Sequence, residues 1–397
     1  QATGEVLETN VNAQITITAA PMEDFASGSN GKPDVIPALR EWKGASGQIT
    51  LSNGSRIIVD AENYRENDAV HVKANLSKTD NFYNQVNMFK ADLKSQTGLD
   101  LPIVPDQEAG IVTGQEPVGE DIYFTAQSAP ESLGAEGYVI EFGGQNGDGN
   151  CVIVRAPHKT GILYGGITIL QILKQNAALT LPKGMIRDYP AYEKRGYMLD
   201  AARIYLPLEY LEDTLKQMAW YKMNTFSVHL NDCENWGNLA LGQERYSAFR
   251  LESNVPGLTA EDGFYTKDEF REFQYDAVDL GINVIPEFDT PGHSLAFTRV
   301  WPELAREDNA KYLDVTKPQA LEKVKALFDE YILPQGGEEE VFIGPEVNVG
   351  TDEYKTNGLP EADRTRYKEA FRGYIDQILK HVKNRGKEPA FWGCLRE

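Results

Sequence analysis

The sequence predicts an α/β protein in which a (β/α)8 barrel of the TIM type follows a small α+β domain. Apolar strands and helices alternate five times between Arg195 and Glu397, a pattern typical of a parallel sheet with helices outside it. Between residues 58 and 190 the strands pair locally and helical periods lie between them, as in α+β domains. We therefore expect an extended N-terminal segment with short strands at 1–57, the α+β domain at 58–190 and the barrel at 191–397.

The composition is that of a soluble globular protein with an acidic surface. Of 397 residues, 41% are hydrophobic and 25% are charged, and no run approaches the roughly 20 apolar residues that span a membrane. The 60 Asp and Glu residues against 39 Lys and Arg give a net charge of −21, which would repel nucleic acid. The three cysteines have no C-x-x-C spacing, so neither a disulfide framework nor a zinc knuckle is predicted.

In the first two segments each element has its own local signal. Ile15–Thr18 alternates as a short strand does, and residues 84–95 carry apolar side chains at helical spacing, with Gly98 as the C-cap. Tyr138–Phe142 and Cys151–Val154 enclose a turn rich in Asn, Asp and Gly, which predicts a hairpin. The remaining elements are a strand at 56–59 and a helix at 160–174.

In the barrel segment the predicted strands and helices follow one another directly. Gly196–Asp200 is predicted as a buried first strand, and Thr266 and Glu269 form a capping box for one of the helices. The further strands are expected at 225–230, 282–288, 347–350 and 389–392, and the helices at 208–222, 267–280, 320–331 and 364–384.

Five β/α units are too few for a closed barrel, which needs eight in roughly 250 residues. They would leave an open sheet edge and an uncovered core. We therefore expect that the sequence is part of a longer polypeptide or that a second chain supplies the rest, and Gln1 in place of Met suggests removal of residues upstream. A closed eight-stranded barrel within this chain would refute that expectation. A doubly wound sheet is the alternative arrangement.

Polar residues gather where the predicted strands end. In parallel barrels these carboxyl ends form the active-site face. Converging carboxylates repel one another, which costs stability unless a function offsets the cost. An arginine and a tryptophan beside them suit a sugar, because Arg binds hydroxyls and an aromatic face stacks on the ring. In chain order the residues are Asp200 and Arg203; His229, Asp232 and Glu234; Glu287, Asp289 and His293; Asp352 and Glu353; Trp392 and Glu397.

Taken singly, each of these residues also has a structural interpretation. Asp200 and Asp232 would fit as caps of the loops after their strands, and Asp289 as part of the turn before Pro291. Only their coincidence at one face favours a functional site. His293 would fit as a structural histidine whose ring nitrogens are hydrogen-bonded, and Arg203 as a solvated loop arginine. Asp352–Glu353 would fit as a common dipeptide at a strand end, and Trp392 as a core residue.

Four segments, in order and on successive predicted strands, resemble motifs of the family-20 glycoside hydrolases, the β-N-acetylhexosaminidases. The α+β domain also resembles that family's companion domain, including Gly137–Tyr138 and Asp188–Pro190. The resemblance covers the chain from about residue 58 to its end. The four segments are Arg195–Arg203 (R-G-x-x-L-D-x-x-R), His229–Asp232 (H-L-x-D), Ile285–His293 (I-P-E-x-D-x-P-G-H) and Gly350–Glu353 (G-x-D-E).

The resemblance implies a retaining exo-glycosidase that removes terminal β-linked N-acetylhexosamine (GlcNAc or GalNAc) from glycans by substrate-assisted catalysis. It implies that Glu353 is the general acid and then the base. Asp352 would hold the substrate's 2-acetamido group, whose oxygen attacks the anomeric carbon to give an oxazolinium intermediate. Neither a cofactor nor a metal is implied. Since Glu353 must be protonated near neutral pH, we expect crowding and partial burial to raise its pKa.

The resemblance further implies a set of residues around this pair. The chain departs from the family there, which often has His where Asn348 stands, and Asp and Gln where Cys233 and Glu234 stand. Pocket residues from the last three barrel strands have no counterpart. The implied set consists of Arg203 for the ring hydroxyls, Asp232, Asp289 and His293 in support of the pair, and Trp392 in the acetamido pocket.

Other functions stay open at this stage. A lacto-N-biosidase, which releases Gal-β1,3-GlcNAc, needs a deeper pocket, and the altered loop Cys233–Asn238, with Trp236, could widen one. A catalytically silent glycan-binding module is less favoured, because binding alone needs no Asp352–Glu353 pair. A metal-dependent barrel hydrolase is disfavoured because the first strand lacks H-x-H and the chain has only five histidines. We expect a glycan as partner, no nucleic acid or membrane span, and an extracellular, cell-surface or periplasmic bacterial location, with the oligomeric state left unassigned.

Overall fold

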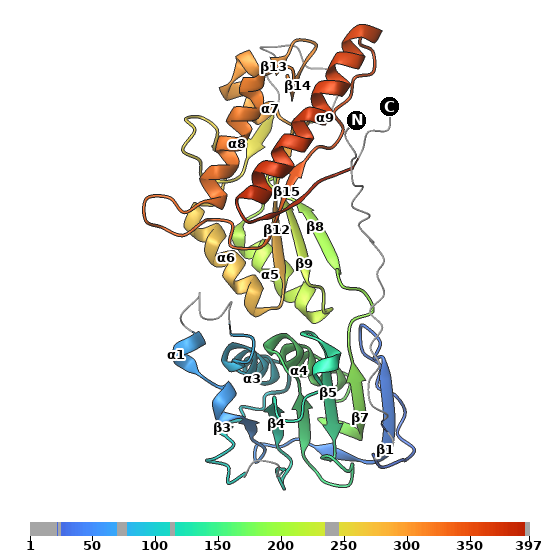
Figure 1. The fold of residues 1–397 in the computed structure, drawn as a ribbon. Coiled ribbons are helices and arrows are strands. Elements are labelled where there is room, and N and C mark those ends of the chain that lie inside the picture. The colour runs from blue at the N-terminus through green and yellow to red at the C-terminus, as the bar shows by residue number, and fades with distance from the viewer. Residues whose placement is uncertain (1–21, 23–24, 70–77, 112–115, 235–245, 394–397) are drawn as a thin grey trace. The chain divides into compact units, whose positions relative to one another are not determined.

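The computed structural model describes residues 22, 25–69, 78–111, 116–234 and 246–393, which fold around two separate main sheets (Figure 1). The described residues up to Arg195 form the first unit, together with the short stretches 218–223 and 279–281. The second unit comprises the described residues of 196–217, 224–278 and 282–397. The predicted strand at Ile15–Thr18 lies outside the described residues.

A mixed seven-stranded sheet forms the first unit, in the order β1-β7-β5-β6-β4-β2-β3. β1 (Glu41–Thr50) pairs antiparallel with β7 (Thr180–Asp188), so β1, which lies in the predicted N-terminal segment, is a full member of this sheet. The predicted hairpin is confirmed, because β5 and β6 pair antiparallel. The other strands run parallel to β6. In chain order, the strands from β2 to β6 span Ile57–Val59 (β2), Ile103–Pro105 (β3), Ile122–Thr125 (β4), Tyr138–Phe142 (β5) and Val152–Arg155 (β6).

Two helices cover this sheet. α3 (Tyr83–Thr97) packs against α4 (Lys159–Lys174), and α4 packs on β5, β6 and β7. Nearly every residue of α4 is buried, which agrees with its apolar character on all sides. Gly98 ends α3 in the left-handed conformation, with φ 80° and its N–H bonded to the Lys94 carbonyl, so the predicted C-cap is confirmed. Shorter elements are α1 (Glu66–Ala69) and the 3-10 turns Ala61–Asn63 and Glu131–Leu133.

The second unit is built on a parallel sheet whose five strands lie side by side in chain order, β8-β9-β12-β15-β16. This order is that of a barrel wound in one direction, whereas a doubly wound sheet reverses its order near the middle. The five predicted strands are therefore confirmed, and among the described residues the sheet is open at β8 and β16. The strands span Gly196–Asp200 (β8), Thr225–His229 (β9), Asn283–Thr290 (β12), Glu346–Gly350 (β15) and Glu388–Ala390 (β16).

Helices follow the strands as predicted. α8 packs against α9, and α9 contacts β15 and β16 (Figure 1). Two small hairpins, β10–β11 and β13–β14, were not predicted, because strands this short show no sequence period. The helices are α5 (Leu208–Trp220), α6 (Lys267–Asp279), α7 (Leu295–Val300), α8 (Pro318–Ile332) and α9 (Glu361–Asn384), with a 3-10 turn at Pro302–Leu304. The hairpin strands are Asn231–Cys233 (β10), Ser247–Phe249 (β11), Ala305–Arg306 (β13) and Asn309–Leu313 (β14).

The prediction that the first strand of this sheet is buried is wrong. Tyr197 and Met198 of β8 are 46% and 41% exposed. β8 is an edge strand, paired only with β9 in the described part of the chain. At the opposite edge, Phe391 and Trp392 are similarly exposed. An apolar run predicts the strand correctly, but it does not say whether a neighbouring strand covers it.

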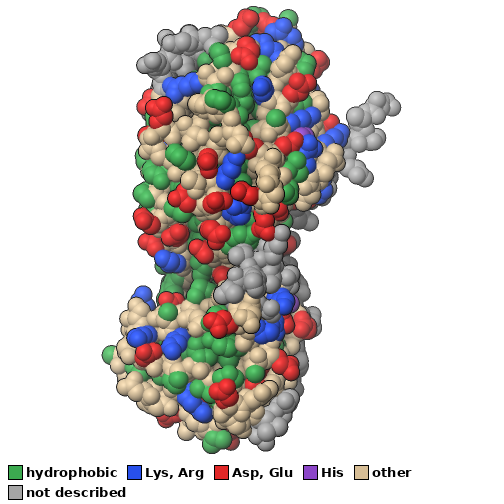
Figure 2. Space-filling model, turned by 90° about the vertical axis from the view of Figure 1, so that its left-hand side faces the viewer, with side chains coloured by type: hydrophobic (Ala, Val, Ile, Leu, Met, Phe, Trp, Pro, Cys, Tyr) green, Lys and Arg blue, Asp and Glu red, His purple; other side chains and the backbone are tan. Residues whose placement is uncertain are grey.

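Charged side chains of both signs lie over the surface. Figure 2 shows many Asp and Glu side chains over the second unit, with Lys and Arg side chains between them.

In the part of the chain that the structure describes, no helix has both the length and the apolar character needed to cross a bilayer.

The capping box predicted for α6 is formed. Thr266 Oγ1 accepts a hydrogen bond from the Glu269 backbone N–H at 3.2 Å, and the Glu269 carboxylate accepts one from the Thr266 N–H at 2.8 Å. Two amides at the start of the helix thereby gain acceptors. The cap fixes where α6 begins, and α6 leads into β12, the central strand of the sheet.

We expect Thr266→Ala to lower the free energy of unfolding of the second unit by about 1 kcal/mol, because α6 loses an acceptor at its N-terminus. Urea denaturation followed by circular dichroism measures the loss. Thr214→Ala is the matched control, since the Thr214 hydroxyl donates to the Tyr210 carbonyl at an exposed position within α5. A loss at Thr266 no larger than that at Thr214 contradicts the prediction.

Candidate active site

The strands of the second unit bring the predicted site residues together at their carboxyl ends. One row of cross-strand neighbours runs across the sheet, in which Asp200 pairs with His229, His229 with Glu287, and Glu287 with Asn348. Side chains in such a row point to the same face of a parallel sheet. The turns after β8, β12 and β15, the hairpin strand β10, the end of β12 and the segment after β16 add the other candidates, which are Arg203, Asp232, Asp289, His293, Asp352, Glu353 and Trp392.

Asp232 lies at the centre of this set. Its carboxylate is bonded to His229 Nε2 at 2.7 Å and to His293 Nδ1 at 3.0 Å, and it forms an ion pair with Arg203 at 2.5 Å. Burial alone would raise the pKa of the Asp232 carboxyl, but hydrogen bonds from the two histidines hold it well below its usual range. One ionised carboxylate, 1% exposed, therefore fixes three side chains.

His229 lies between two carboxylates. Its Nδ1 is 2.7 Å from Glu287 Oε1, and its Nε2 faces Asp232. Burial opposes protonation, yet the hydrogen bonds that the ring donates to Asp232 and Glu287 raise the pKa of His229 to about 10. The ring is therefore an imidazolium at neutral pH. Its charge offsets the repulsion between the two buried carboxylates.

Glu287 connects this cluster to the last strand. Its carboxylate accepts hydrogen bonds from Asn348 Nδ2 at 2.9 Å and from Trp392 Nε1 at 3.0 Å. Glu287 is fully buried, whereas Trp392 is 39% exposed. The indole is thus held by its N–H while much of its surface remains accessible, as stacking on a sugar ring requires.

Asp289 is a buried carboxyl beside His293. Burial raises the pKa of Asp289 to about 7, and nearby His293 acts in the opposite direction. Asn231 brackets the Asp289 backbone, since its side chain accepts from the Asp289 N–H at 2.8 Å and donates to the Asp289 carbonyl at 2.9 Å. Asn231 was not among the predicted site residues. Its only signal was its place inside the H-L-x-D segment.

Glu353 lies between His293 and Lys355. Its Oε2 is 3.7 Å from His293 Nε2, and its Oε1 is 3.0 Å from Lys355 Nζ. The hydrogen bond from Lys355 lowers the pKa of Glu353 more than partial burial raises it, and His293 and Arg203 act in the same direction as Lys355. The expectation of a raised pKa is therefore wrong for this structure. The lysine two residues further on outweighs the crowding by carboxylates, and the side chain is 41% exposed.

Asp352 is placed through its backbone. Its N–H points to Asp289 Oδ1 at 3.4 Å. On one side of it, the Thr351 hydroxyl donates to the Trp392 carbonyl at 2.9 Å, and the Trp392 N–H donates to the Gly350 carbonyl at 2.8 Å. The end of β15 is thereby tied to the segment after β16.

Arg203 is held at the edge of the cluster. Besides its pair with Asp232, it forms an ion pair with Asp200 at 2.6 Å and donates from Nε to the Cys233 carbonyl at 3.3 Å. Its side chain remains 37% exposed. All seven predicted site residues thus belong to one connected cluster. Glu397 and residues 235–238 of the predicted altered loop lie outside the described residues.

Three sets of histidine and carboxylate side chains have ligand atoms within 4.8 Å of one another. Two of the sets contain His229, whose ring nitrogens both face carboxylates. A metal ligand needs a lone pair on the imidazole, so a metal in either of these sets would have to displace a proton that His229 shares with a carboxylate. The prediction that the site uses no metal stays a prediction. The sets are Asp200, His229 and Asp232; His229, Glu287 and Asp289; and Asp289, His293 and Asp352.

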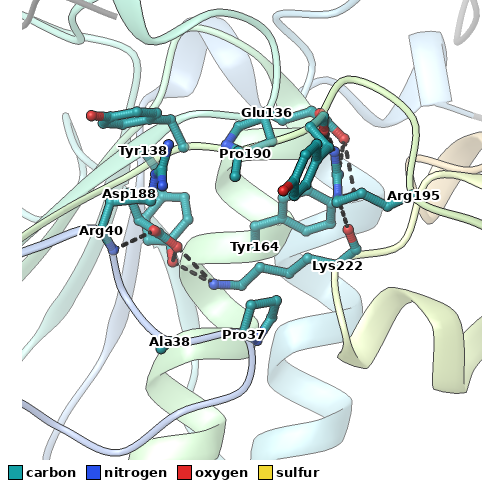
Figure 3. A pocket seen from close by; sticks show the side chains of 13 residues that line it. Pro37, Ala38, Arg40, Glu136, Tyr138, Tyr164, Asp188, Pro190, Arg195 and Lys222 are labelled. Carbon is teal, nitrogen blue, oxygen red and sulfur yellow. Dashed lines mark hydrogen bonds and ion pairs between the residues drawn. The ribbon is translucent and has the colours of Figure 1, made fainter. Parts of the chain in front are cut away.

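A separate cavity of about 350 Å³ lies in the first unit (Figure 3). Lys222 Nζ donates to the Tyr138 hydroxyl at 2.6 Å and to Asp188 at 3.0 Å, and Arg195 forms an ion pair with Glu136 at 2.5 Å. Burial lowers the pKa of Lys222, and Asp188 opposes the change. Since these polar groups bind one another, we assign them a structural role and not a catalytic one.

Comparison with known families and proteins gives matches along most of the chain. A family model described as the catalytic domain of glycosyl hydrolase family 20 matches residues 192–395, and one for domain 2 of that family matches residues 32–189. A lacto-N-biosidase of Bifidobacterium bifidum is 25% identical over 403 residues, which is 95% of this chain and 31% of that protein. A beta-hexosaminidase of Vibrio furnissii is 34% identical over 215 residues, which is 47% of this chain and 35% of that protein. The chain spans about a third of the length of these two relatives.

Solved structures share the fold. A mutant beta-hexosaminidase of Streptomyces plicatus, in complex with the product GlcNAc, superposes with a TM-score of 0.69 at 21% identity, over 93% of this chain and 67% of that one. A β-N-acetylhexosaminidase of Streptomyces coelicolor A3(2) gives a TM-score of 0.67 at 20% identity, over 91% and 67%.

We expect Lys355→Met to raise the pKa of Glu353, because the variant loses the cation that favours the ionised carboxylate. Titration of the carboxyl ¹³C resonances by NMR measures the change, and Glu353→Gln assigns the signal. Lys380→Met is the matched control, since Lys380 pairs with Asp376 on the exposed side of α9. An unchanged or lower pKa of Glu353 in Lys355→Met would show that the ion pair does not set its titration.

Proposed function

Because the chain belongs to glycosyl hydrolase family 20, we propose that it carries the catalytic centre of a retaining exo-β-N-acetylhexosaminidase acting on terminal β-linked N-acetylhexosamine of glycans. The family's structures have a TIM-type barrel preceded by an α+β domain, and the second unit supplies five consecutive parallel strands of such a barrel. One observation carries the proposal. Asp232 binds His293, His293 faces Glu353 at 3.7 Å, and Asp352 lies beside Glu353 in the chain.

In the proposed reaction the nucleophile belongs to the substrate. The acetamido oxygen attacks the anomeric carbon while the bond from that carbon to the leaving oxygen breaks, and Glu353 gives its proton to that oxygen. The attacking oxygen is tethered to the sugar, so it acts at high effective concentration. Asp352 stabilises the cationic oxazolinium electrostatically. Glu353 then takes a proton from water, which attacks the same carbon and reopens the ring with the β configuration retained.

Glu353 must be protonated when the leaving oxygen departs. The ion pair with Lys355 opposes this, because it favours the carboxylate. A sugar that covers Glu353 would remove water from around the carboxyl and so raise its pKa. His293 can then tune the proton affinity of Glu353, since it is bonded to the ionised Asp232 on its other side.

Binding of the terminal sugar is assigned to the accessible members of the cluster. The half-buried guanidinium of Arg203 is fixed by Asp200 and Asp232, and the indole of Trp392 is fixed by Glu287. Because their partners are ionised or buried, both groups are held in place before a ligand arrives. Such pre-organisation favours binding, since less side-chain freedom is lost.

A lacto-N-biosidase is the second candidate, on one specific observation. The relative with that name matches 95% of this chain, whereas the beta-hexosaminidase of V. furnissii matches 47%. That activity would need space for a galactose beyond the terminal GlcNAc subsite. The altered loop that could provide this space includes residues outside the described part of the chain.

We also propose a role in carbohydrate metabolism outside the cytoplasm of a bacterium, at the cell surface, in the medium or in the periplasm. The support is the proposed substrate class, because glycans with terminal N-acetylhexosamine are presented there. Fractionation of the source cells with immunodetection tests the location, and recovery only in the cytoplasmic fraction would refute it.

We expect Glu353→Gln to lower kcat/KM for an oligosaccharide by roughly 10²- to 10⁴-fold, because the departing oxygen loses its proton donor. A substrate with a good aryl leaving group should lose much less. Both rates are measured on the full-length protein. Glu369→Gln, on the exposed side of α9, is the control and should leave both rates unchanged. Normal turnover of the oligosaccharide by Glu353→Gln would remove this residue from the mechanism.

A pair of chromogenic substrates distinguishes the two candidate functions. One carries β-GlcNAc alone, and the other carries the same sugar capped by β1,3-galactose. We expect the full-length protein to act on the bare sugar only, with or without a chelator. Release from the capped sugar only would mean a lacto-N-biosidase, and silence on both would contradict the assignment as a hydrolase of this type.

A further inference from the structure

We propose that Arg306 is a positioning residue for Glu353, which it holds in place through a cage of tyrosine rings. The inference rests on the proposed function, because Glu353 is the acid of that reaction. Arg306 lies on β13, in one of the hairpins that the sequence pattern did not predict. It touches no proposed substrate atom, and its effect is transmitted by the residue that follows Glu353.

The Arg306 guanidinium is enclosed by aromatic rings. Its central carbon is 4.1 Å from the ring centroid of Tyr312, 5.0 Å from that of Tyr354 and 5.3 Å from that of Tyr367. Asp308 accepts two hydrogen bonds, from Nε at 2.6 Å and from Nη2 at 2.9 Å, and Nη1 has no hydrogen-bond acceptor among the described residues. Arg306 is 2% exposed. A charge so shielded from water interacts strongly with ring faces.

Tyr354 connects this cage to the catalytic pair, because it directly follows Glu353. Its ring stacks on Phe371 of α9, with centroids 5.0 Å apart and planes 12° apart. Its hydroxyl donates to the Leu313 carbonyl of β14 at 3.0 Å. Tyr354 is therefore fixed by the β13–β14 hairpin on one side and by α9 on the other.

The backbone between Gly350 and Tyr354 needs such support. Thr351 and Glu353 have φ values of 77° and 45°, which lie in the left-handed region that costs residues with a side chain free energy. Thr351 is anchored ahead of the pair, since its N–H donates to the Thr290 carbonyl at 2.9 Å. Tyr354 is the anchor behind the pair. If the cage opens, the end of the turn behind the pair keeps only the contacts of Tyr354 with Phe371 and with the Leu313 carbonyl.

Glu353 itself has little else to fix it. Among the described residues its side chain is placed by the 3.7 Å approach to His293 and by the pair with Lys355, whose own side chain is 56% exposed. An exposed lysine does not define the position of a carboxylate, because it has many conformations. The position of the acid therefore depends on the backbone of the turn, and hence on the cage.

Hydrogen exchange tests the cage independently of any activity. In the full-length protein, we expect Arg306→Met to speed amide exchange in residues 350–356 at least tenfold, and Arg306→Lys, which keeps a cation, to speed it less. Arg385→Met is the matched control, because Arg385 pairs with Asp329 of α8, and it should leave this segment unchanged. Unchanged exchange in Arg306→Met overturns the proposal.

A milder pair of variants covers the case in which Arg306→Met does not fold. Tyr367 forms one wall of the cage from α9. Tyr367→Leu removes the ring face and should speed exchange of the same segment, while Tyr367→Phe keeps the ring and should not. Equal exchange in the two variants also overturns the proposal.

Kinetics separate positioning from a general loss of structure. We expect Arg306→Lys to lower kcat for an oligosaccharide at least tenfold more than kcat for a substrate with a good aryl leaving group, with KM little changed, because only the first needs a well-placed acid. Equal losses on both would mean a purely structural role and refute the proposal. If the unsubstituted protein hydrolyses neither substrate, the proposed function fails, and the exchange data still decide whether the cage holds the turn.

Discussion

The second unit depends on neutralising buried carboxylates at one face of its sheet. Asp232 and Glu287 are both almost inaccessible to water, and the imidazolium of His229 bridges them at 2.7 Å on each side. Arg203 adds a second positive charge beside Asp232, and His293 adds a hydrogen bond. Without these cations the carboxylates would repel each other in a medium that screens charge poorly. The other residues of the candidate site are arranged around this frame.

The same frame gives carboxyl groups of one type very different proton affinities. Asp232, bonded to two histidines, stays ionised, whereas burial raises the pKa of Asp289 to about 7. Glu353 lies at the accessible edge, where Lys355 favours its ionised form. The surroundings of each carboxyl group, and not the residue type, determine whether it is protonated or ionised. The acid of the proposed reaction is thus the group whose surroundings a bound sugar would change most.

Much of this arrangement can be predicted from the sequence, because the strands are short apolar runs that end in polar residues, as at Asp200 and His229. Their order in the chain is also their order in the sheet, so residues from consecutive strands meet. Three features could not be predicted. The exposure of Tyr197 arises because β8 has only one neighbouring strand among the described residues. The lowered pKa of Glu353 depends on where Lys355 points, and the cage around Arg306 depends on contacts between segments far apart in sequence. None of these three features produces a recognisable pattern in the local amino-acid sequence.

The row Asp200, His229, Glu287 and Asn348 has one more consequence, for how the strands find their partners. These residues are direct cross-strand neighbours. If one strand slipped by a single residue, its polar side chain would turn to the opposite face and leave a buried charge unpaired. Apolar strands tolerate such a slip more easily, because one aliphatic side chain replaces another. The row therefore favours the native register of the strands, because sheets with a shifted register are less stable. This effect is independent of any substrate.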